Sequence, residues 1–384
     1  MERSSFAALD GRSVFLTGHT GFKGAWLSLW LQRLGASVSG YALDPPTRPN
    51  LFTDARVRGA LRSHHRGDVR DRAALSRALR EAGPDIIIHL AAQALVRGGL
   101  KRPFETFDVN VMGTATLLEA LRDLGRPCVL IVVTSDKCYR DTGPAGGCRE
   151  DDPLGGADPY SASKGACEIL VESYRSSFFS PQRLASHGIK LATVRAGNVI
   201  GGGDWAADRI VPDIVRALTS AQPVSLRNPS AVRPWQHVLE PLGGYLLLAA
   251  RMLAAGDAEG CGSWNFGPTH ESQRPVSDLV GRFIDAWGGG SWVSAAADAR
   301  FNETQMLTLS IEKATDRLGW KPQWGFARAI NRTARWYRKW VADPLAARDT
   351  CLEDIAAYEL DLLRETAARS TCPVAPAAVE SAKF

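Results

Sequence analysis

The chain has no apolar run long enough to cross a lipid bilayer. A membrane-spanning helix needs about 18 consecutive apolar residues, and the longest candidate, residues 245–255, is interrupted by Arg251. The opening stretch, MERSSFAALDGRS, lacks the apolar core of a secretion signal. These absences argue against a membrane protein, and we expect a cytoplasmic location.

The seven cysteines form no CxxC pair, and we see no spacing typical of a metal site. Scattered cysteines suit reduced thiols, and we predict no metal. The 384 residues carry a net charge of +5, but no basic run concentrates it. This disfavours nucleic acid as a partner and suits an anionic small-molecule substrate.

Apolar, β-rich runs alternate with helical patterns through the first half of the chain. The runs cover residues 13–17, 36–43, 84–92, 128–135 and 189–197. Helical stretches between them include residues 71–82 and 104–124. Continuous apolar strands separated by helices are typical of a parallel sheet that is covered on both faces. The pattern predicts an α/β fold with a Rossmann-type doubly wound parallel sheet.

The composition changes after about residue 198, where Gly- and Pro-rich loops mix with shorter helices. We expect residues 1–197 to form the Rossmann domain with the catalytic residues. Residues 198–364 should form most of a smaller, loop-rich substrate-binding lobe, with possible return segments to the sheet. Residues 365–384 are rich in Ala, Ser and Pro and should be a flexible tail.

The string LTGHTGFKG places three glycines, Gly18, Gly21 and Gly24, between the first apolar run and a helical stretch. In that setting glycines permit a tight turn, the close approach of a pyrophosphate, and close packing of helix on strand. Asp44 ends the next strand, about twenty residues later, where a carboxylate binds ribose hydroxyls and repels a 2′-phosphate. We predict a dinucleotide site that prefers NAD to NADP, although Arg48 lies close enough in sequence to weaken that preference.

The string DPYSASKG places Tyr160 and Lys164 on one face at the start of a helix. A phenol has a pKa near 10 and is a poor base at neutral pH, but an adjacent ammonium favours its ionised form. Ser135, just past an apolar strand, is expected to meet a substrate oxygen shared with Tyr160. The alternative, a solvated Tyr–Lys pair on a helix surface, explains less of this arrangement.

These motifs, together with HLAAQ and in this order, resemble an extended short-chain dehydrogenase/reductase that modifies nucleotide sugars. Finer strings are similar to the CDP-glucose 4,6-dehydratase branch of that family, among them TGHTGFKGAWLSLWLQRLGA, VTSDKCY, RAGNVIGGGDW and RPWQHVLEPLGGYLLLA. The similarity runs from about residue 11 to about residue 340. One departure is DTGPAGGCRED, residues 141–151, which lacks a tryptophan-containing loop expected there, so the contacts of that loop are not carried over.

The resemblance implies NAD as cofactor and CDP-glucose as substrate. It implies that Tyr160 takes the proton of the C4 hydroxyl while hydride leaves C4, with Ser135 bonding the same oxygen. Lys137 then removes the C5 proton, and Asp136 in its neutral form protonates the departing C6 hydroxyl. Hydride returns to C6 to give a 4-keto-6-deoxy sugar. Related dTDP-glucose enzymes carry Glu at the position of Lys137.

The resemblance also implies the binding residues. For NAD they are Gly18, Thr20, Gly21, Phe22, Gly24, Asp44, Asp68, Val69, Ala91, Tyr160 and Lys164. For the nucleotide sugar they are Asn198, Arg209, Arg233 and His237. Asp71, close to Asp68, is instead expected to cap a helix. Nothing in the residues themselves selects cytidine over another base.

Three alternatives stay open. A nucleotide-sugar 4-epimerase would use Tyr160, Lys164 and NAD but would need no acid and base such as Asp136 and Lys137. A second alternative is a 4,6-dehydratase for another nucleotide hexose. A non-catalytic NAD-binding regulator should have lost Tyr160 or Lys164. Extended relatives commonly dimerise through two helices per subunit, here residues 104–124 and 160–179, so we expect a homodimer.

Overall fold

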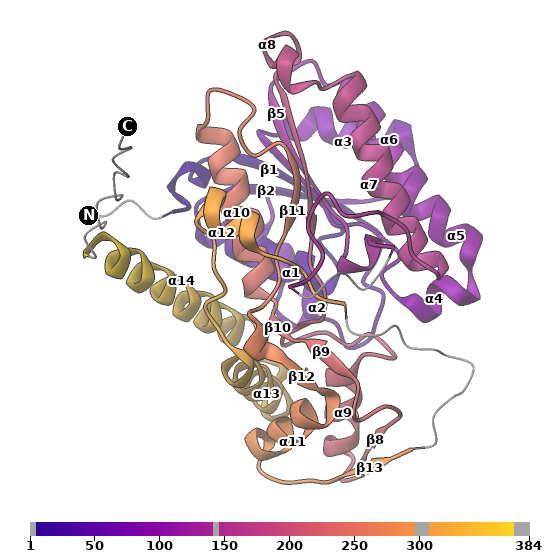
Figure 1. The fold of residues 1–384 in the computed structure, drawn as a ribbon, viewed down its shortest axis with the longest axis vertical. Helices are drawn as coiled ribbons and strands as arrows, with labels where there is room; N and C mark the ends of the chain where they lie inside the picture. Colours follow the sequence, from indigo (N-terminus) through magenta and orange to yellow (C-terminus); the bar gives the residue numbers. More distant parts are fainter. Residues whose placement is uncertain (1–4, 141–145, 296–306, 372–384) are drawn as a thin grey trace, which may run out of the picture.

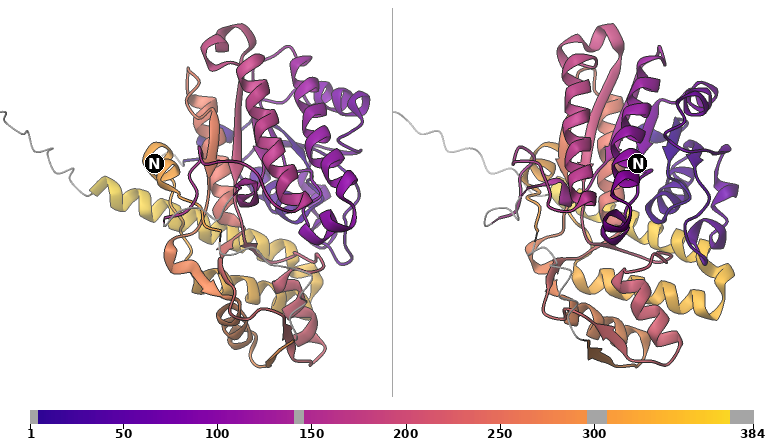
Figure 2. Two further views of the ribbon diagram at one scale, coloured as in Figure 1. Left: turned by 45° about the vertical axis from the view of Figure 1, so that its right-hand side comes forward. Right: turned by 90° about the vertical axis from the view of Figure 1, so that its right-hand side faces the viewer.

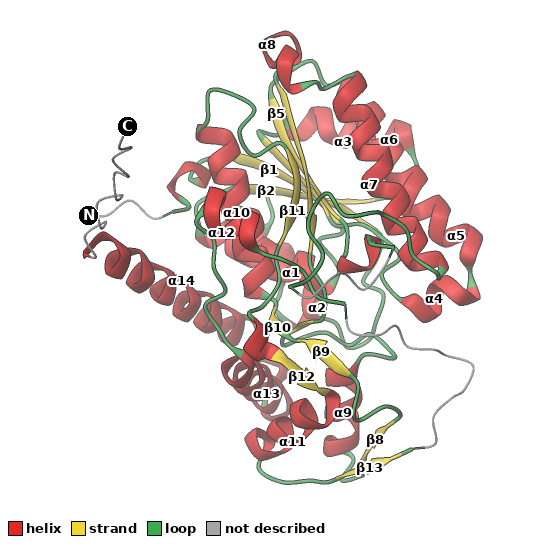
Figure 3. Cartoon of the chain, viewed as in Figure 1, coloured by secondary structure: helices red, strands yellow, loops and turns green. Residues whose placement is uncertain are grey.

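The computed structural model describes residues 5–140, 146–295 and 307–371, and a seven-stranded sheet forms its centre (Figures 1 and 3). The strand order is β11-β6-β5-β4-β1-β2-β3, and every pairing in this sheet is parallel. The strands are β1 (Ser13–Thr17), β2 (Ser37–Ala42), β3 (Ser63–Arg66), β4 (Ile86–His89), β5 (Cys128–Val133), β6 (Ile189–Arg195) and β11 (Gly262–Asn265). The order reverses between β1 and β4, as in a doubly wound Rossmann sheet. The predicted fold class is confirmed.

Helices cover both faces of the sheet, and Figure 2 shows the two layers on opposite sides. One layer holds α3 (Arg72–Ala82), α6 (Gly113–Arg122) and α7 (Pro159–Ser177). The other holds α1 (Phe22–Arg33) and α10 (Leu239–Ala254). Val14 and Leu16 of β1 belong to the core under α1 and α10, whereas Phe15 belongs to the core under α3, α6 and α7. Since both faces are buried, the inner strands β1, β4 and β5 are mainly apolar and buried, whereas the edge strand β3 (SHHR) is polar and only partly buried.

The predicted helix over residues 104–124 is interrupted. It consists of α5 (Pro103–Phe107), a π-helical turn (Asp108–Met112) and α6, and the short helix α4 (Val96–Lys101) precedes it. Two further short helices are α2 (Leu51–Asp54) and α8 (Leu184–His187). In the described ranges, no helix is long and apolar enough to cross a membrane.

The smaller lobe lies beyond the carboxyl ends of the strands, in the lower part of Figure 1. Its elements are β7 (Val199–Ile200), α9 (Ile210–Thr219), β8 (Val224–Leu226), β9 (Val232–Pro234), β10 (Gln236–His237), β12 (Gln273–Pro275), α11 (Val276–Trp287), β13 (Trp292–Ser294) and α13 (Phe326–Ala342). Two segments within this part of the chain return to the main sheet: α10 packs on one of its faces and β11 forms one of its edges. Helix α12 (Glu312–Leu318) packs against β11 and α10. The last helix, α14 (Ala347–Thr371), continues beyond residue 365, where a tail was expected to begin.

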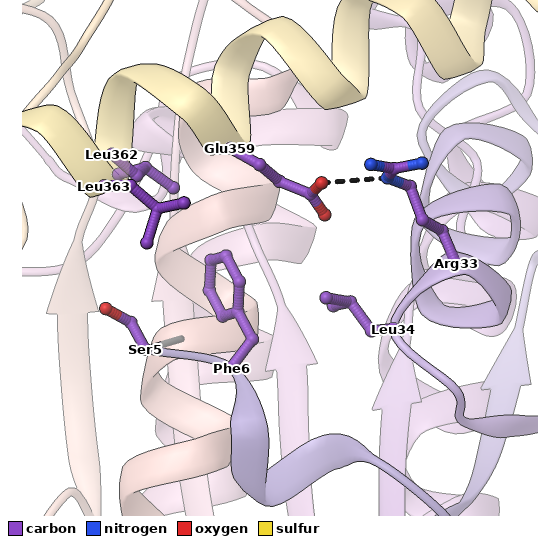
Figure 4. Close-up of a pocket in the computed structure, with 7 residues that line it drawn as sticks. All are labelled: Ser5, Phe6, Arg33, Leu34, Glu359, Leu362 and Leu363. Carbon is purple, nitrogen blue, oxygen red and sulfur yellow. Dashed lines mark hydrogen bonds and ion pairs between the residues drawn. The ribbon is translucent and has the colours of Figure 1, made fainter. Parts of the chain in front are cut away.

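A cavity at the amino-terminal edge of the sheet is separate from the glycine loop (Figure 4). Its lining residues are Ser5, Phe6, Arg33, Leu34, Glu359, Leu362 and Leu363. Arg33 ends α1, whereas Gly21 caps its first residue, so about 18 Å of helix separates the cavity from the loop. This cavity is therefore not part of the candidate active site.

Candidate active site

The glycine loop joins β1 to α1 at the carboxyl edge of the sheet. Gly18 has a φ of +75°, and a Cβ there would lie 2.7 Å from the backbone nitrogen of Ala91, after β4. A Cβ at Gly24 would lie 2.2 Å from the carbonyl oxygen of Gly18. Gly21 differs, because that oxygen at 3.4 Å is all that its Cβ would meet within 4 Å. Gly18 and Gly24 are required for packing, and Gly21 leaves an open approach to the backbone.

This cradle fits a dinucleotide such as NAD. The first N–H groups of α1 have no partner within the helix, so they can bind a pyrophosphate. Leu43 and Asp44 are exposed just after β2, where an adenosine ribose would bind. The Asp44 carboxylate lies 2.6 Å from the Arg66 guanidinium. Arg66 therefore offsets part of the negative charge that was expected to repel a 2′-phosphate.

Three other predicted cofactor residues help to build the cradle. The hydroxyl of Thr20 donates a hydrogen bond of 2.9 Å to the carbonyl of Leu43, which ties the glycine loop to the end of β2. The half-buried ring of Phe22 packs against the core. Val69 is buried, and a Cβ at Gly113 would lie 2.8 Å from its side chain. These contacts shape the walls of the site.

Asp68 and Asp71, which follow β3, have different roles. The Asp68 carboxylate binds the guanidinium of Arg70 at 2.6 Å, and this hydrogen bond holds the pKa of Asp68 below its usual range. Arg70 also binds Asp108 at 2.7 Å. Asp71 accepts a hydrogen bond of 3.0 Å from the backbone of Ala74 and caps α3, as predicted. An adenine contact by Asp68 remains a prediction.

Helix α7 carries the Tyr–Lys pair. The Asp158 carboxylate accepts hydrogen bonds from the backbone N–H groups of Tyr160 (2.9 Å) and Ser161 (3.0 Å), so the helix begins directly after it. Tyr160 and Lys164 are both buried. The Lys164 ammonium donates a hydrogen bond of 3.3 Å to the carbonyl of Val133, at the end of β5. The end of β5 and the start of α7 are thereby joined.

The ionisation of Tyr160 differs from the sequence-based expectation. Burial raises the pKa of Tyr160 to about 12, although a hydrogen bond with Ser135 and the positive charge of Arg209 act to lower it. Burial also lowers the pKa of the Lys164 ammonium. In the ligand-free protein, desolvation therefore outweighs the stabilisation of the phenolate that the sequence predicted from Lys164.

Ser135, Asp136 and Lys137 follow β5 on one tight turn. The Ser135 hydroxyl donates to the Asp136 carboxylate at 2.8 Å and accepts from the backbone N–H of Lys137 at 3.2 Å. A Cβ at Gly197, after β6, would lie 1.8 Å from a carboxylate oxygen of Asp136. The glycine of RAGNV thus makes room for this carboxylate, which is buried, while Lys137 is half-buried.

A buried polar network connects the elements on both sides of this turn. Glu168, one turn after Lys164 on α7, forms an ion pair of 2.8 Å with Arg195 of β6. Its carboxylate also accepts from the hydroxyls of Thr134 and Thr193, and Arg195 donates to the hydroxyl of Tyr139 at 2.7 Å. Burial acts to raise the pKa of Glu168, but Arg195 prevails and lowers it. The network fixes the residues on both sides of the catalytic turn.

The smaller lobe contributes cations beyond the carboxyl ends of the strands. Arg209 caps α9 and donates to the carbonyl of Ala94 at 3.4 Å. Arg233 of β9 lies directly opposite Arg274 of β12 in the antiparallel pairing of these strands. Asn198 adopts a left-handed φ of +44° at the crossing from the sheet to the lobe. These positions fit the binding of an anionic nucleotide.

Comparison with known proteins identifies the family of the chain. A family model described as GDP-mannose 4,6 dehydratase matches residues 15–333. The chain belongs to the GDP-mannose 4,6 dehydratase family. A relative in Salmonella typhimurium, described as CDP-glucose 4,6-dehydratase, is 47% identical over 333 residues, which are 86% of this chain and 92% of the relative.

Solved structures agree with this assignment to the dehydratase family. A dTDP-glucose 4,6-dehydratase from Streptomyces venezuelae, determined with NAD bound, is 26% identical, with a TM-score of 0.71 over 86% of this chain and 99% of the other. A UDP-glucose 4-epimerase from Thermus thermophilus, also in complex with NAD, is 26% identical, with a TM-score of 0.69 over 85% and 98%. The fold is therefore shared by dehydratases and epimerases.

One predicted residue of this dehydratase-family chain lies elsewhere. His237 is fully buried, with its ring 5.9 Å from that of Trp26 and 4.9 Å from that of Trp324. Its Nδ1 accepts from the backbone of Leu239 at 3.3 Å, and burial lowers the pKa of His237 to about 3. Its neighbours in RPWQHV suggested a ligand contact, but tertiary packing places the ring in the core. We do not include it in the substrate site.

One cation near the dehydratase-family site was missed. Lys23 follows Phe22 in the glycine string, and burial together with the charge of Arg209 lowers the pKa of Lys23 to about 8, while Asp136 opposes this effect. Its position could have been noticed, because a cation in the first turn of a helix is unfavourable next to the helix dipole. Lys23 adds positive charge beside Asp136 and Lys164.

Proposed function

We propose that this NAD-dependent dehydratase converts CDP-glucose to CDP-4-keto-6-deoxyglucose. The observation that carries the proposal is the placement of Asp136 and Lys137 on the turn after Ser135, which hydrogen-bonds Tyr160. The substrate assignment is supported by the 47% identity to the Salmonella CDP-glucose 4,6-dehydratase, which extends over 86% of this chain.

The first step in our proposal is oxidation at C4. Tyr160 takes the proton of the C4 hydroxyl, and Ser135 donates a hydrogen bond to the same oxygen. Bound NAD would supply the hydride chemistry, accepting a hydride from the sugar and returning it later. Because burial raises the pKa of Tyr160 to about 12, Tyr160 needs additional positive charge on the assembled site to act as a base at neutral pH. The charge of Arg209 already acts on Tyr160 in the ligand-free protein, so the additional charge would come with bound NAD, whose oxidised nicotinamide ring is cationic.

The second step is loss of water across C5 and C6. The C4 ketone acidifies the C5 hydrogen, which the neutral amine of Lys137 removes, while the carboxyl of Asp136 protonates the departing C6 hydroxyl. Return of hydride to C6 and of a proton to C5 completes the product. The elimination needs both an acid and a base, and the two are adjacent on one turn.

For the nucleotide we assign Asn198, Arg209 and Arg233. The guanidinium fork of arginine matches phosphate oxygens in pairs, and Arg233 lies on a strand of the lobe, opposite Arg274. We also propose that the enzyme acts in the cytoplasm, because the cysteines among the described residues are free thiols, which suits a reducing compartment.

We further propose a homodimer formed through α5 and α7, which pack against each other. Several large apolar side chains on these helices and the turn between α5 and α6 are exposed: Phe104 (84%), Ile169 (60%), Met112 (56%), Phe178 and Phe107. An apolar patch spread over neighbouring helices usually marks an interface. Dimerisation of this kind would cover the outer face of the helix that carries Tyr160.

The test is the mass of the product made from CDP-glucose by the purified protein supplied with NAD. We expect loss of one water from the sugar. An unchanged mass with inversion at C4 would indicate a 4-epimerase, and no turnover would support a non-catalytic role. Parallel reactions with dTDP-glucose, UDP-glucose and GDP-mannose test the base, since greater turnover of one of these would contradict the CDP assignment.

A further inference from the structure

An ion-pair cluster connects α4 to the smaller lobe. Arg97 of α4 binds the carboxylate of Asp208, just before α9, at 2.8 Å, and Arg227, just after β8, lies 3.9 Å from the same oxygen. Beside Asp208, Arg209 donates to the carbonyl of Ala94. Two successive lobe residues therefore contact the segment that follows β4.

The cluster lies next to the catalytic centre. A Cβ at Gly99 of α4 would be only 3.1 Å from the backbone nitrogen of Tyr160, so the helix carrying Arg97 packs directly on the start of α7. The charge of Arg209 acts on Tyr160 from the lobe side. A ligand entering between α4 and α9 would pass this cluster.

Two features of Asp208 distinguish it from an ordinary surface carboxylate. Its φ of +62° lies in the left-handed region, which costs free energy for a residue other than glycine and is often retained at functional sites. Its side chain is 38% exposed and that of Arg97 is 28% exposed, so solvent screens the pair and breaking it is inexpensive. The Asp208 carboxylate lies close to two guanidinium groups, those of Arg97 and Arg227, and the charges of Asp208 and Arg97 also act on Asp213 of α9.

We propose that Asp208 takes the place of a phosphate while the cleft is empty, and that Arg97 and Arg227 exchange its carboxylate for the diphosphate of the incoming nucleotide sugar. The inference rests on the proposed function and extends the substrate site to two arginines and to the acid they release. A diphosphate carries more negative charge than one carboxylate and offers oxygens to both forks. Exchange would therefore be favourable, because the two arginines would pair with more negative charge than the carboxylate supplies.

The two partners of this one ion pair should affect binding in opposite directions. We would measure the affinity of the NAD-loaded protein for CDP by titration calorimetry. Arg97→Gln should weaken binding roughly tenfold to a hundredfold, as expected for loss of a charge-assisted contact, and Arg97→Lys should retain part of the affinity. Asp208→Asn should instead tighten binding several-fold, because the competing anion is gone and its repulsion of the ligand is removed.

A matched control is Glu353→Gln, which removes one negative charge from an ion pair of 2.9 Å with Lys339, on α13 and α14, and should leave the affinity unchanged. If Asp208→Asn weakened CDP binding as Arg97→Gln does, the pair would only hold the cleft together and the exchange would be refuted. UDP, dTDP and GDP are titrated in parallel. Tight binding of one of these in place of CDP would contradict the proposed substrate. The exchange would then be tested by measuring the affinities of Arg97→Gln and Asp208→Asn for that nucleotide.

Discussion

At the scale of single residues, the chemistry of the site depends on what each side chain is buried against. Sequence patterns identified Tyr160, Lys164 and Ser135 because their spacing is fixed by local structure. They could not predict that burial raises the pKa of Tyr160 or that His237 lies between two tryptophans. Both outcomes depend on residues far away in the sequence, as does the charge of Arg209 near Lys23.

The role of Tyr160 is tested by Tyr160→Phe, which keeps the ring and removes the proton acceptor. Turnover of CDP-glucose should fall by about 10²- to 10⁴-fold, the usual contribution of a positioned base, while CDP affinity measured by calorimetry should stay near that of the unmodified protein. Tyr174→Phe is the matched control, because the Tyr174 hydroxyl of α7 donates a hydrogen bond to Glu119 of α6. Near-normal turnover by Tyr160→Phe would require another base.

Lys137→Ala separates oxidation at C4 from elimination. Tyr160 should still act on the C4 hydroxyl in this variant, but the ketone should persist because no base removes the C5 proton. We expect reduced-nicotinamide absorbance to accumulate after addition of CDP-glucose, and solvent deuterium to stay out of C5.

Rapid exchange at C5 in Lys137→Ala would contradict this role. In that case Lys137 would only adjust Asp136, and water or another side chain would be the base. Lys101→Ala, which removes an amine from the end of α4, serves as the control and should show complete turnover.

At the scale of secondary structure, the apolar runs predicted β1, β2, β4, β5 and β6 within a few residues of their observed ends. The strand β11, GSWN, was not predicted because it is short and contains Gly and Ser, and only pairing with β6 makes it a strand. The π-helical turn at Asp108–Met112 was also not predicted, because the helical sequence pattern continues through it. The caps at Asp71 and Asp158 have local causes, and the sequence predicted the first of them.

Helix α10 provides a stability prediction through Glu240, which is fully buried. Its carboxylate accepts from the backbone of Trp324 at 2.6 Å and from the Tyr358 hydroxyl of α14 at 2.8 Å. Burial raises its pKa from 4.5 to about 7, despite these hydrogen bonds. The folded protein thus holds this proton more tightly than the unfolded chain, so this contribution to stability is complete below about pH 4.5 and is lost as the pH rises through 7.

We expect the free energy of unfolding in urea to fall between pH 5 and pH 8 by roughly 3 kcal/mol more in the unmodified protein than in Glu240→Gln, which cannot titrate. Comparing the two proteins cancels the contributions of other ionisable groups. Equal pH dependence in both would show that Glu240 keeps its usual pKa.

At the scale of the whole molecule, the sheet and the lobe meet at the carboxyl ends of the strands, where NAD and the sugar have to lie together. The sequence predicted this division because composition changes near residue 198. It could not predict the contact between the two parts, since Arg97 belongs to α4 whereas Asp208 and Arg227 belong to the lobe. Such clusters become visible only when the chain is folded.

The proposed dimer is tested by placing charge in the apolar patch. Ile169→Asp combined with Phe104→Asp should convert a dimer into a monomer in sedimentation experiments, because two carboxylates would have to be desolvated at the interface. Leu345→Asp is the control, since Leu345 is equally apolar and 64% exposed but lies between α13 and α14. A monomeric unmodified protein, or a double variant that stays dimeric, would refute this interface.

The central claim is that one site oxidises C4, eliminates water and reduces C6 on the same sugar molecule. The most direct measurement uses CDP-glucose with deuterium at C4 and locates the label in the product by NMR. We predict deuterium at C6 of a 4-keto-6-deoxy sugar, with unlabelled and labelled substrate mixed in one reaction giving no exchange of label between molecules. Deuterium retained at C4, lost to solvent or transferred to other sugar molecules would contradict the account.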